Sequence, residues 1–334
     1  MKRLVFLLFI LLLGVGSAWG KTVSGEVVMT FDLSGQPSGR EARLWIPYPI
    51  SDADQLISDI HWEGDYSEAA VYTDRENSIP ILYARWAADA DSRRLTLRFR
   101  AERREQLHRD IPRADVPLDR AAFSRYLSAT SMGPIDGPVK ALADQIVAGK
   151  KTNLEKARAI YDWTVDNTFR DPNTRGCGLG NVPRLLDRPG GKCADISSIY
   201  VALARSAGVP AREILGIRLG KKDGQDITGW QHCWAEFYQP GYGWVPVDPA
   251  DVRKAMLKQN LKLGDPQVAE LREYFWGGVD AYRVRLSEGR DIELNPPQQG
   301  PAVNYLMYPF AQVGGKTLDW LDPQTFRYQI TYRQ

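Results

Sequence analysis

The 334-residue chain contains only three cysteines and three histidines, a scarcity that restricts the chemistry it can perform. The histidines lie far apart and no His-Glu-x-x-His occurs, which argues against the common zinc patterns. No acidic loop has the spacing of a calcium site. The stretch GCGLG lacks the strand and helix that frame a dinucleotide fingerprint. The sequence therefore predicts neither a bound metal nor a cofactor.

Long hydrophobic runs are also scarce. The apolar run from Leu4 to Leu13 is shorter than the ~20 residues that span a bilayer. It follows Lys2 and Arg3, and the small residues of Ala18-Trp19-Gly20 offer a signal-peptidase site. We therefore predict a signal peptide at residues 1–20 and export to the periplasm or the extracellular space. A retained membrane anchor is the alternative, but no stable membrane insertion is expected after cleavage.

The chain has little excess charge of either sign. Loss of residues 1–20 lowers the 43 basic residues to 41, which equals the 41 acidic residues. A mature chain with no formal net charge gives no reason to expect a nucleic-acid partner. Low-complexity tracts and internal repeats are absent from the sequence, which has the composition of an ordinary globular protein.

Hydrophobic periodicity divides the chain into regions. From residue 22 to about 103 the pattern alternates and is broken by Gly, Pro, Asp and Ser, which predicts a β-sandwich-like domain over residues 21–130. Residues 131–252 mix helical and strand patterns, including a helix over 139–148 and a capping box from Thr152 to Glu155. Residues 253–334 are predicted to form a C-terminal extension with a helix near 268–275 and short strands.

One cysteine has an unusual position. The stretch GGKCADISSIYVALARSAGVPARE, residues 190–213, places Cys193 after two glycines and at the start of a helical pattern. Unpaired amides and the helix dipole favour the thiolate there, and the same amides can stabilise an oxyanion. The alternative is a small buried residue that packs beneath a loop.

A nucleophilic thiol usually needs a base, and the strand WQHCWAEFY supplies His232. If residues 239–243 form the turn of a hairpin, Tyr238 faces Trp244, and Asp248 lies one diagonal step from His232. Asp248 would then hold the imidazole in the correct tautomer. Alternatively, Asp248 caps a helix or ends the strand before Pro249.

The remaining cysteines and two tryptophans leave alternatives open. In an oxidising compartment there are two alternatives: either Cys177 and Cys233 pair and leave Cys193 free, or Cys233 is buried and Cys177 is free in its glycine-rich loop. Trp230 and Trp234 either line a substrate cleft or pack in the ordinary way.

At these motifs the sequence resembles the transglutaminase-like superfamily, of the bacterial exported type, whose core has the papain-like fold. GGKCADISSIYVALARSAGVPARE is similar to its cysteine motif, QHCWAEFY to its histidine motif and GWVPVDPAD to its aspartate motif. The resemblance covers about residues 138–252. It implies an α+β fold, with a helix carrying the cysteine packed on an antiparallel sheet, and makes residues 131–252 the catalytic domain. It also implies Cys193 as nucleophile, His232 as general base and acid, and Asp248 as the orienting residue.

These inferences predict a cysteine-dependent acyl-transfer enzyme that acts on amide bonds of a peptide or protein through a thioester. Water as the second substrate gives hydrolysis, as in a peptidase or amidase, and an amine gives transfer, as in a transglutaminase. The alternative from another class is a binding or scaffold module that keeps the fold without turnover.

Overall fold

The computed structural model describes residues 20–74, 76, 78–114 and 116–334. The predicted signal peptide lies outside the described residues except for Gly20. In the described part, no helix is both long enough and apolar enough to cross a membrane.

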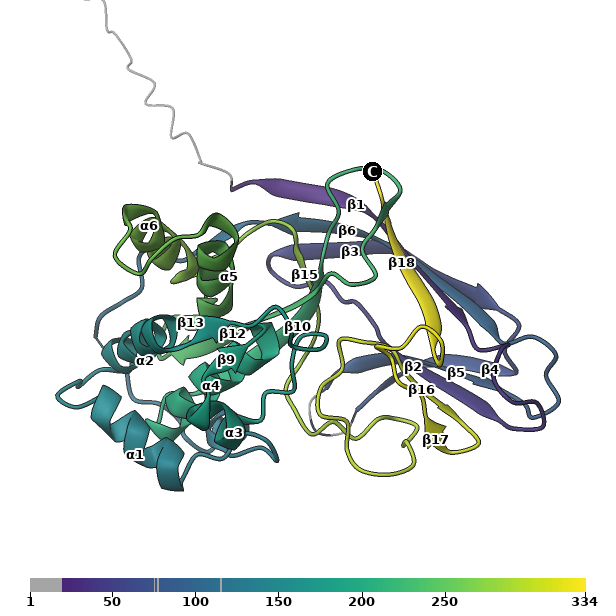
Figure 1. The fold of residues 1–334 in the computed structure, drawn as a ribbon, viewed down its shortest axis with the longest axis horizontal. Coiled ribbons are helices and arrows are strands. Elements are labelled where there is room, and N and C mark those ends of the chain that lie inside the picture. The colour runs from purple at the N-terminus through teal and green to yellow at the C-terminus, as the bar shows by residue number, and fades with distance from the viewer. Residues whose placement is uncertain (1–19, 75, 77, 115) are drawn as a thin grey trace, which may run out of the picture.

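Two antiparallel sheets of five strands each form one half of the molecule, at the right of Figure 1. One sheet has the order β11-β18-β1-β6-β3 and the other β17-β16-β2-β5-β4. The strands from the first part of the chain are β1 (Thr22–Asp32), β2 (Ala42–Pro47), β3 (Gln55–Gly64), β4 (Glu68–Thr73), β5 (Pro80–Trp86) and β6 (Arg94–Arg104). The alternating sequence pattern thus forms the predicted sandwich.

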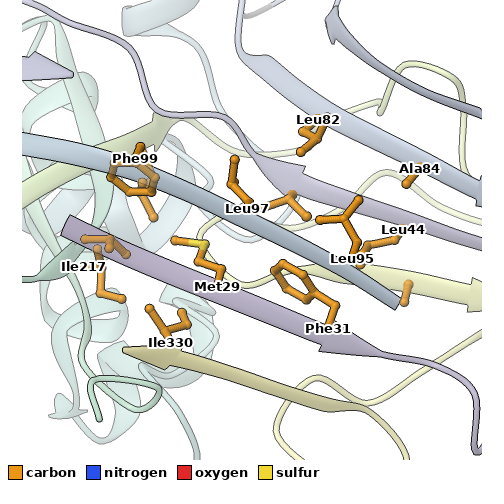
Figure 2. Close-up of a cluster of buried hydrophobic side chains, with 14 of the residues drawn as sticks. Met29, Phe31, Leu44, Leu82, Ala84, Leu95, Leu97, Phe99, Ile217 and Ile330 are labelled. Atoms are coloured by element: carbon orange, nitrogen blue, oxygen red, sulfur yellow. The ribbon is translucent and has the colours of Figure 1, made fainter. Parts of the chain in front are cut away.

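The interior of the sandwich shows why alternation predicts it. Along β6, Leu95, Leu97 and Phe99 are buried, while the residues between them are more exposed. Figure 2 shows them beside Met29 and Phe31 of β1, with side chains of the other sheet across the interior. Burial of this apolar surface from both sheets stabilises the layered arrangement.

Both ends of the described chain meet in one sheet. The last strand, β18 (Arg327–Arg333), runs antiparallel to β1, with Asp32 opposite Arg327 and Glu26 opposite Arg333 (Figure 1). Three further strands complete the sandwich sheets: β11 (Gln225–Asp226), β16 (Phe310–Val313) and β17 (Lys316–Thr317). The predicted boundary at residue 253 remains a prediction, and two of the strands that follow it, β16 and β18, pair with β2 and β1 of the N-terminal region.

The other half combines helices with a four-stranded antiparallel sheet of order β13-β12-β10-β15. Its strands are β10 (Ala211–Arg218), β12 (Gln231–Gln239), β13 (Gly243–Val247) and β15 (Arg283–Glu288). Its helices are α1 (Gly137–Ile146), α2 (Asn153–Asn167), α3 (Val182–Asp187), α4 (Cys193–Ser206), α5 (Pro249–Gln259) and α6 (Pro266–Phe275). The short elements are η1 (Ser124–Leu127) and two pairs, β7 (Gln106–Leu107) with β14 (Gly278–Val279) and β8 (Phe169–Arg170) with β9 (Gly190–Gly191). The predicted α+β fold is confirmed.

Helix α4 occupies the centre of this half. Every residue from Cys193 to Arg205 is buried, because helices pack on one side of α4 and the sheet on the other. The core therefore fixes the start of α4.

Helix α2 begins with the predicted capping box, in which Thr152 Oγ1 accepts from the Glu155 amide at 3.2 Å and Glu155 Oε2 accepts from the Thr152 amide at 3.0 Å.

Candidate active site

Cys193 is the first residue of α4, as the sequence predicts, and only 3% of it is exposed. The strand pair β8–β9 brings Gly190 and Gly191 to the helix start. A Cβ on Gly191 would lie 2.2 Å from a carboxylate oxygen of Asp195, so only glycine fits there. The close approach of the Asp195 side chain to the backbone at residue 191 therefore depends on glycine at that position.

Asp195 ties the glycine-rich loop to the helix start. Its carboxylate accepts hydrogen bonds from the amides of Lys192 at 3.1 Å and Gly180 at 2.8 Å. Gly178 adopts a φ of +92°, and a Cβ there would lie 1.9 Å from Asp195. Burial raises the pKa of Asp195, although the two amide bonds act in the opposite direction. The loop that carries Cys177 is thereby held against Cys193.

The hairpin register that the sequence predicts is confirmed. Tyr238 lies opposite Trp244, and the ladder between β12 and β13 ends with Ala235 opposite Val247. Asp248 follows directly, and its Oδ2 lies 2.8 Å from Nε2 of His232. Nε2 thus faces the carboxylate, and His232 is also close enough to Cys193 to lower the pKa of its thiol.

Asp248 also begins a helix. Its Oδ1 accepts from the Asp251 amide at 2.8 Å, which makes Asp248 the N-cap of α5. The two readings that the sequence left open are thus compatible. One carboxylate oxygen caps α5 and the other faces His232.

A buried arginine that the sequence analysis missed stabilises this carboxylate. Arg283 of β15 has no exposed surface and donates to Asp248 Oδ2. It also donates to Asp251 at 2.8 Å and to Asp280 at 2.9 Å. Burial alone would raise the pKa of Asp251, but the charges of Arg218, His232 and Arg283 hold it well below its ordinary value. Asp248 therefore faces His232 within a compensated network of charges.

His232, Asp248 and Asp251 each place one ligand atom within 4.8 Å of the others, a spacing that a metal ion could use. The Arg283 guanidinium already bonds both carboxylates, and Arg218 bonds Asp251 as well. The positive charge beside these carboxylates is thus supplied by arginine side chains of the chain itself.

Three free and buried cysteines, Cys177, Cys193 and Cys233, belong to one cluster at the start of α4. The side chains of Cys177 and Cys233 lower the pKa of Cys193, burial raises it, and His232 lowers it further, so the pKa lies well below its ordinary value. The Cys177 thiol also donates to the Gln231 carbonyl at 3.4 Å. The pKa of Cys177 is raised by its interaction with Cys193 and by burial, and that of Cys233 by burial and then by Cys193. Of the two alternatives that the sequence left open, the structure agrees with free thiols, and Cys177 is buried as well as Cys233.

Cys193 and His232 lie at the wall of a cleft of about 850 Å³. Aromatic side chains from the C-terminal region form part of its lining, namely Tyr308, Trp320, Phe326 and Tyr328. Trp230 also lines the cleft, as one reading predicted, whereas Trp234 is buried with Ile214 and Val279 and stacks on His232. No local pattern links the C-terminal aromatic residues to the cysteine.

Comparison with known proteins agrees with this geometry. The model of the transglutaminase-like superfamily matches residues 140–249. An uncharacterized protein of Haemophilus influenzae is 37% identical over 338 residues, which covers 92% of this chain and 91% of that protein. The chain belongs to the transglutaminase-like superfamily. The predicted family is confirmed.

Two more distant relatives of this superfamily member are informative. A protein-glutamine gamma-glutamyltransferase of Pseudomonas aeruginosa is 32% identical over 101 residues, which covers 28% of this chain and 15% of that protein. The crystal structure of a proposed cysteine protease from Cytophaga hutchinsonii is 15% identical, with a TM-score of 0.55 over 94% of this chain and 98% of that one. The second likeness shows a shared fold along nearly the whole chain.

Proposed function

We propose that this protein is an exported, cysteine-dependent acyl-transfer enzyme that acts on amide bonds through a Cys193–His232–Asp248 triad. The observation that carries the proposal is the position of His232, which lies between the Asp248 carboxylate at 2.8 Å and the thiol of Cys193. A nucleophile, a base and an orienting carboxylate in this order are the parts that thiol acyl transfer needs.

In the first half-reaction the Cys193 thiolate attacks the carbonyl carbon of an amide. The resulting oxyanion faces the start of α4. The Ala194 amide there already donates to the Cys177 carbonyl oxygen at 2.9 Å, so we assign the Cys193 amide as the hydrogen-bond donor to the oxyanion. Protonated His232 gives its proton to the leaving nitrogen. The carbon–nitrogen bond then breaks, the amine departs and a thioester remains on Cys193.

The second half-reaction regenerates the thiolate. His232 takes a proton from water or from an incoming amine, which attacks the thioester and releases an acid or a new amide. The name of the Pseudomonas aeruginosa relative supports transfer to an amine. The size of the cleft, about 850 Å³, supports entry of water and therefore hydrolysis as well.

The sequence of residues 1–20 supports the proposed export. A basic start, an apolar run and small residues before the expected cleavage site support a signal peptide. Its removal would leave the triad in the periplasm or outside the cell, where peptides and protein side-chain amides are the available acyl donors.

The direct test is an unbiased screen of peptide amides with mass detection, with and without an added primary amine. We expect an acid without the amine and an amine adduct with it, and acid quenching should trap an acyl group on the Cys193 peptide. Cys193→Ala is the control and should give neither product. Absence of products together with a slowly alkylated Cys193 would favour the binding or scaffold module.

A further inference from the structure

Most of the charged side chains that line the cleft are basic. Asp251 is the acidic residue among them, whereas six are basic: Arg170, Lys192, Arg218, Lys221, Lys254 and Lys258. These residues come from β8, the start of α4, β10 and its following loop, and α5. The excess is therefore a property of the assembled cleft and not of one basic run in the sequence.

Internal ion pairs account for only part of this charge. Arg218 pairs with Asp251 and Asp280, and Lys254 lies 3.9 Å from Asp251. Arg283 also bonds Oδ2 of Asp251, whereas the other oxygen, Oδ1, lies 3.9 Å from Lys254 and has no hydrogen-bond partner among the described residues. Within the described residues, Arg170, Lys192 and Lys258 have no carboxylate within ion-pair distance, and Lys221 lies over the ring of Tyr282.

The basic groups on one wall are close enough to disfavour one another. Lys254 and Lys258 lie one turn apart on α5. Burial lowers the pKa of Lys254, Asp251 opposes this, and the charges of Arg218, Lys258 and Arg170 lower it further. A negatively charged ligand would relieve this repulsion.

Two neutral donors also lack a partner. The buried Nε2 of Gln231 and the buried Nε1 of Trp320 have no hydrogen-bond acceptor among the described residues, and both residues line the cleft. Buried donors normally find an acceptor, which a bound molecule would supply here. Cations and unpartnered donors thus indicate the same kind of ligand, one rich in acceptor oxygens.

We propose that the acyl donor is an acidic peptide, whose carboxylates bind Arg170, Lys254 and Lys258 while its amide reaches Cys193. This inference rests on the proposed function. A single-stranded nucleic acid also has negative charges and planar groups for aromatic side chains. It offers no amide for the thiolate to attack, so the position of Cys193 in the same cleft favours the peptide.

The rate of Cys193 alkylation tests the electrostatic potential in the cleft independently of turnover. Iodoacetate carries a negative charge and iodoacetamide does not, so their rate ratio at Cys193 reports the local potential. In the double variant R170Q/K258Q we expect this ratio to fall by about threefold or more at low salt. The matched control K150Q/K316Q removes two exposed charges outside the cleft and should leave the ratio unchanged.

Turnover then tests the acyl donor itself. For peptides with the same amide flanked by Glu or by Gln, we expect kcat/KM to favour the acidic peptide by about tenfold, and R170Q/K258Q to remove most of that preference. An equal ratio of alkylation rates in R170Q/K258Q and the control would overturn the proposal, as would protection of Cys193 by an oligonucleotide and not by the acidic peptide. If neither peptide reacts but the alkylation ratio falls, the proposed acyl transfer is wrong and the anion-binding cleft stands.

Discussion

Between the two sheets of the sandwich, apolar side chains such as Leu97 and Phe99 have no exposed surface, whereas behind His232 an equally buried space holds Arg283 and Asp248. The first interior gains stability in proportion to the apolar area it removes from water. The second gains little net stability from its charges, because desolvation offsets their attraction. The proposed function assigns the charged interior the role of orienting His232, and the following variants test this contrast.

The largest expected effect is on turnover. Cys193→Ala removes the nucleophile from a small buried site, so we expect turnover to fall by about 10⁴-fold or more. The thermal unfolding midpoint should change little, because alanine fits the same space. Rates and midpoints measured on one sample would show this, and substantial turnover in Cys193→Ala would require another nucleophile.

The largest effect on stability is expected at Arg283. Arg283→Met leaves Asp248, Asp251 and Asp280 without their buried cation, at a cost of about 4 kcal/mol. Chemical denaturation of the variant and the natural chain measures this loss. Turnover per folded molecule should fall as well, since Asp248 no longer has a fixed position. Normal turnover in the folded fraction would mean that Arg283 does not position the triad.

A variant in the sandwich should lower the stability of the protein without changing the reactivity of Cys193. Leu97→Ala creates a cavity between the sheets and should cost about 3 kcal/mol. The rate at which iodoacetamide alkylates Cys193 in the folded protein should stay the same, because the cavity lies away from the triad. A change in that alkylation rate as large as the change in turnover that Arg283→Met causes would remove the contrast between the apolar and the charged interior.

An intermediate effect is expected from acid. The pKa of Asp251 is lower in the folded chain than in the unfolded chain, so its contribution to stability is complete above its unfolded pKa of about 4 and is lost as the pH falls below that. Unfolding midpoints measured across this range should fall more steeply for the natural chain than for Asp251→Asn. Equal slopes would show that the carboxylate is not stabilised by folding.

The smallest effect is expected at the exposed start of α2. Thr152→Ala removes the side-chain acceptor of the capping box and should cost about 1 kcal/mol. The same denaturation assay measures the cost, and activity should not change. A loss as large as that for Leu97→Ala would mean that Thr152 has a role beyond the cap.

The sequence predicts those parts of the site that depend on local order. Cys193 is recognisable at a helix start, and the turn after Gln239 fixes the register that brings Asp248 to His232. Arg283 is not recognisable in this way, because β15 reaches the triad only by pairing with β10. The one available signal is the spacing of Asp248 and Asp251, two carboxylates at a helix start that need a cation.

The same limit applies to the fold. Alternation predicts the strands of the sandwich, but it does not show that β18 completes the first sheet beside β1. Phe326 and Tyr328 of the cleft lie at the start of β18, and Tyr308 precedes β16, which pairs with β2. No short-range pattern encodes either pairing. Long-range pairing therefore explains most of what the sequence analysis missed.

The central claim is that His232, held by Asp248, keeps Cys193 as a thiolate. The most direct measurement is the rate of Cys193 alkylation by iodoacetamide from acid to alkaline pH, with peptide mapping to separate Cys177 and Cys233. Because the pKa of Cys193 lies well below its ordinary value, we expect fast alkylation that persists from neutral pH into the acid range, before the other two thiols react. A rate that rises only near the ordinary thiol pKa of about 8.5, or equal labelling of Cys177 and Cys193, would contradict the account.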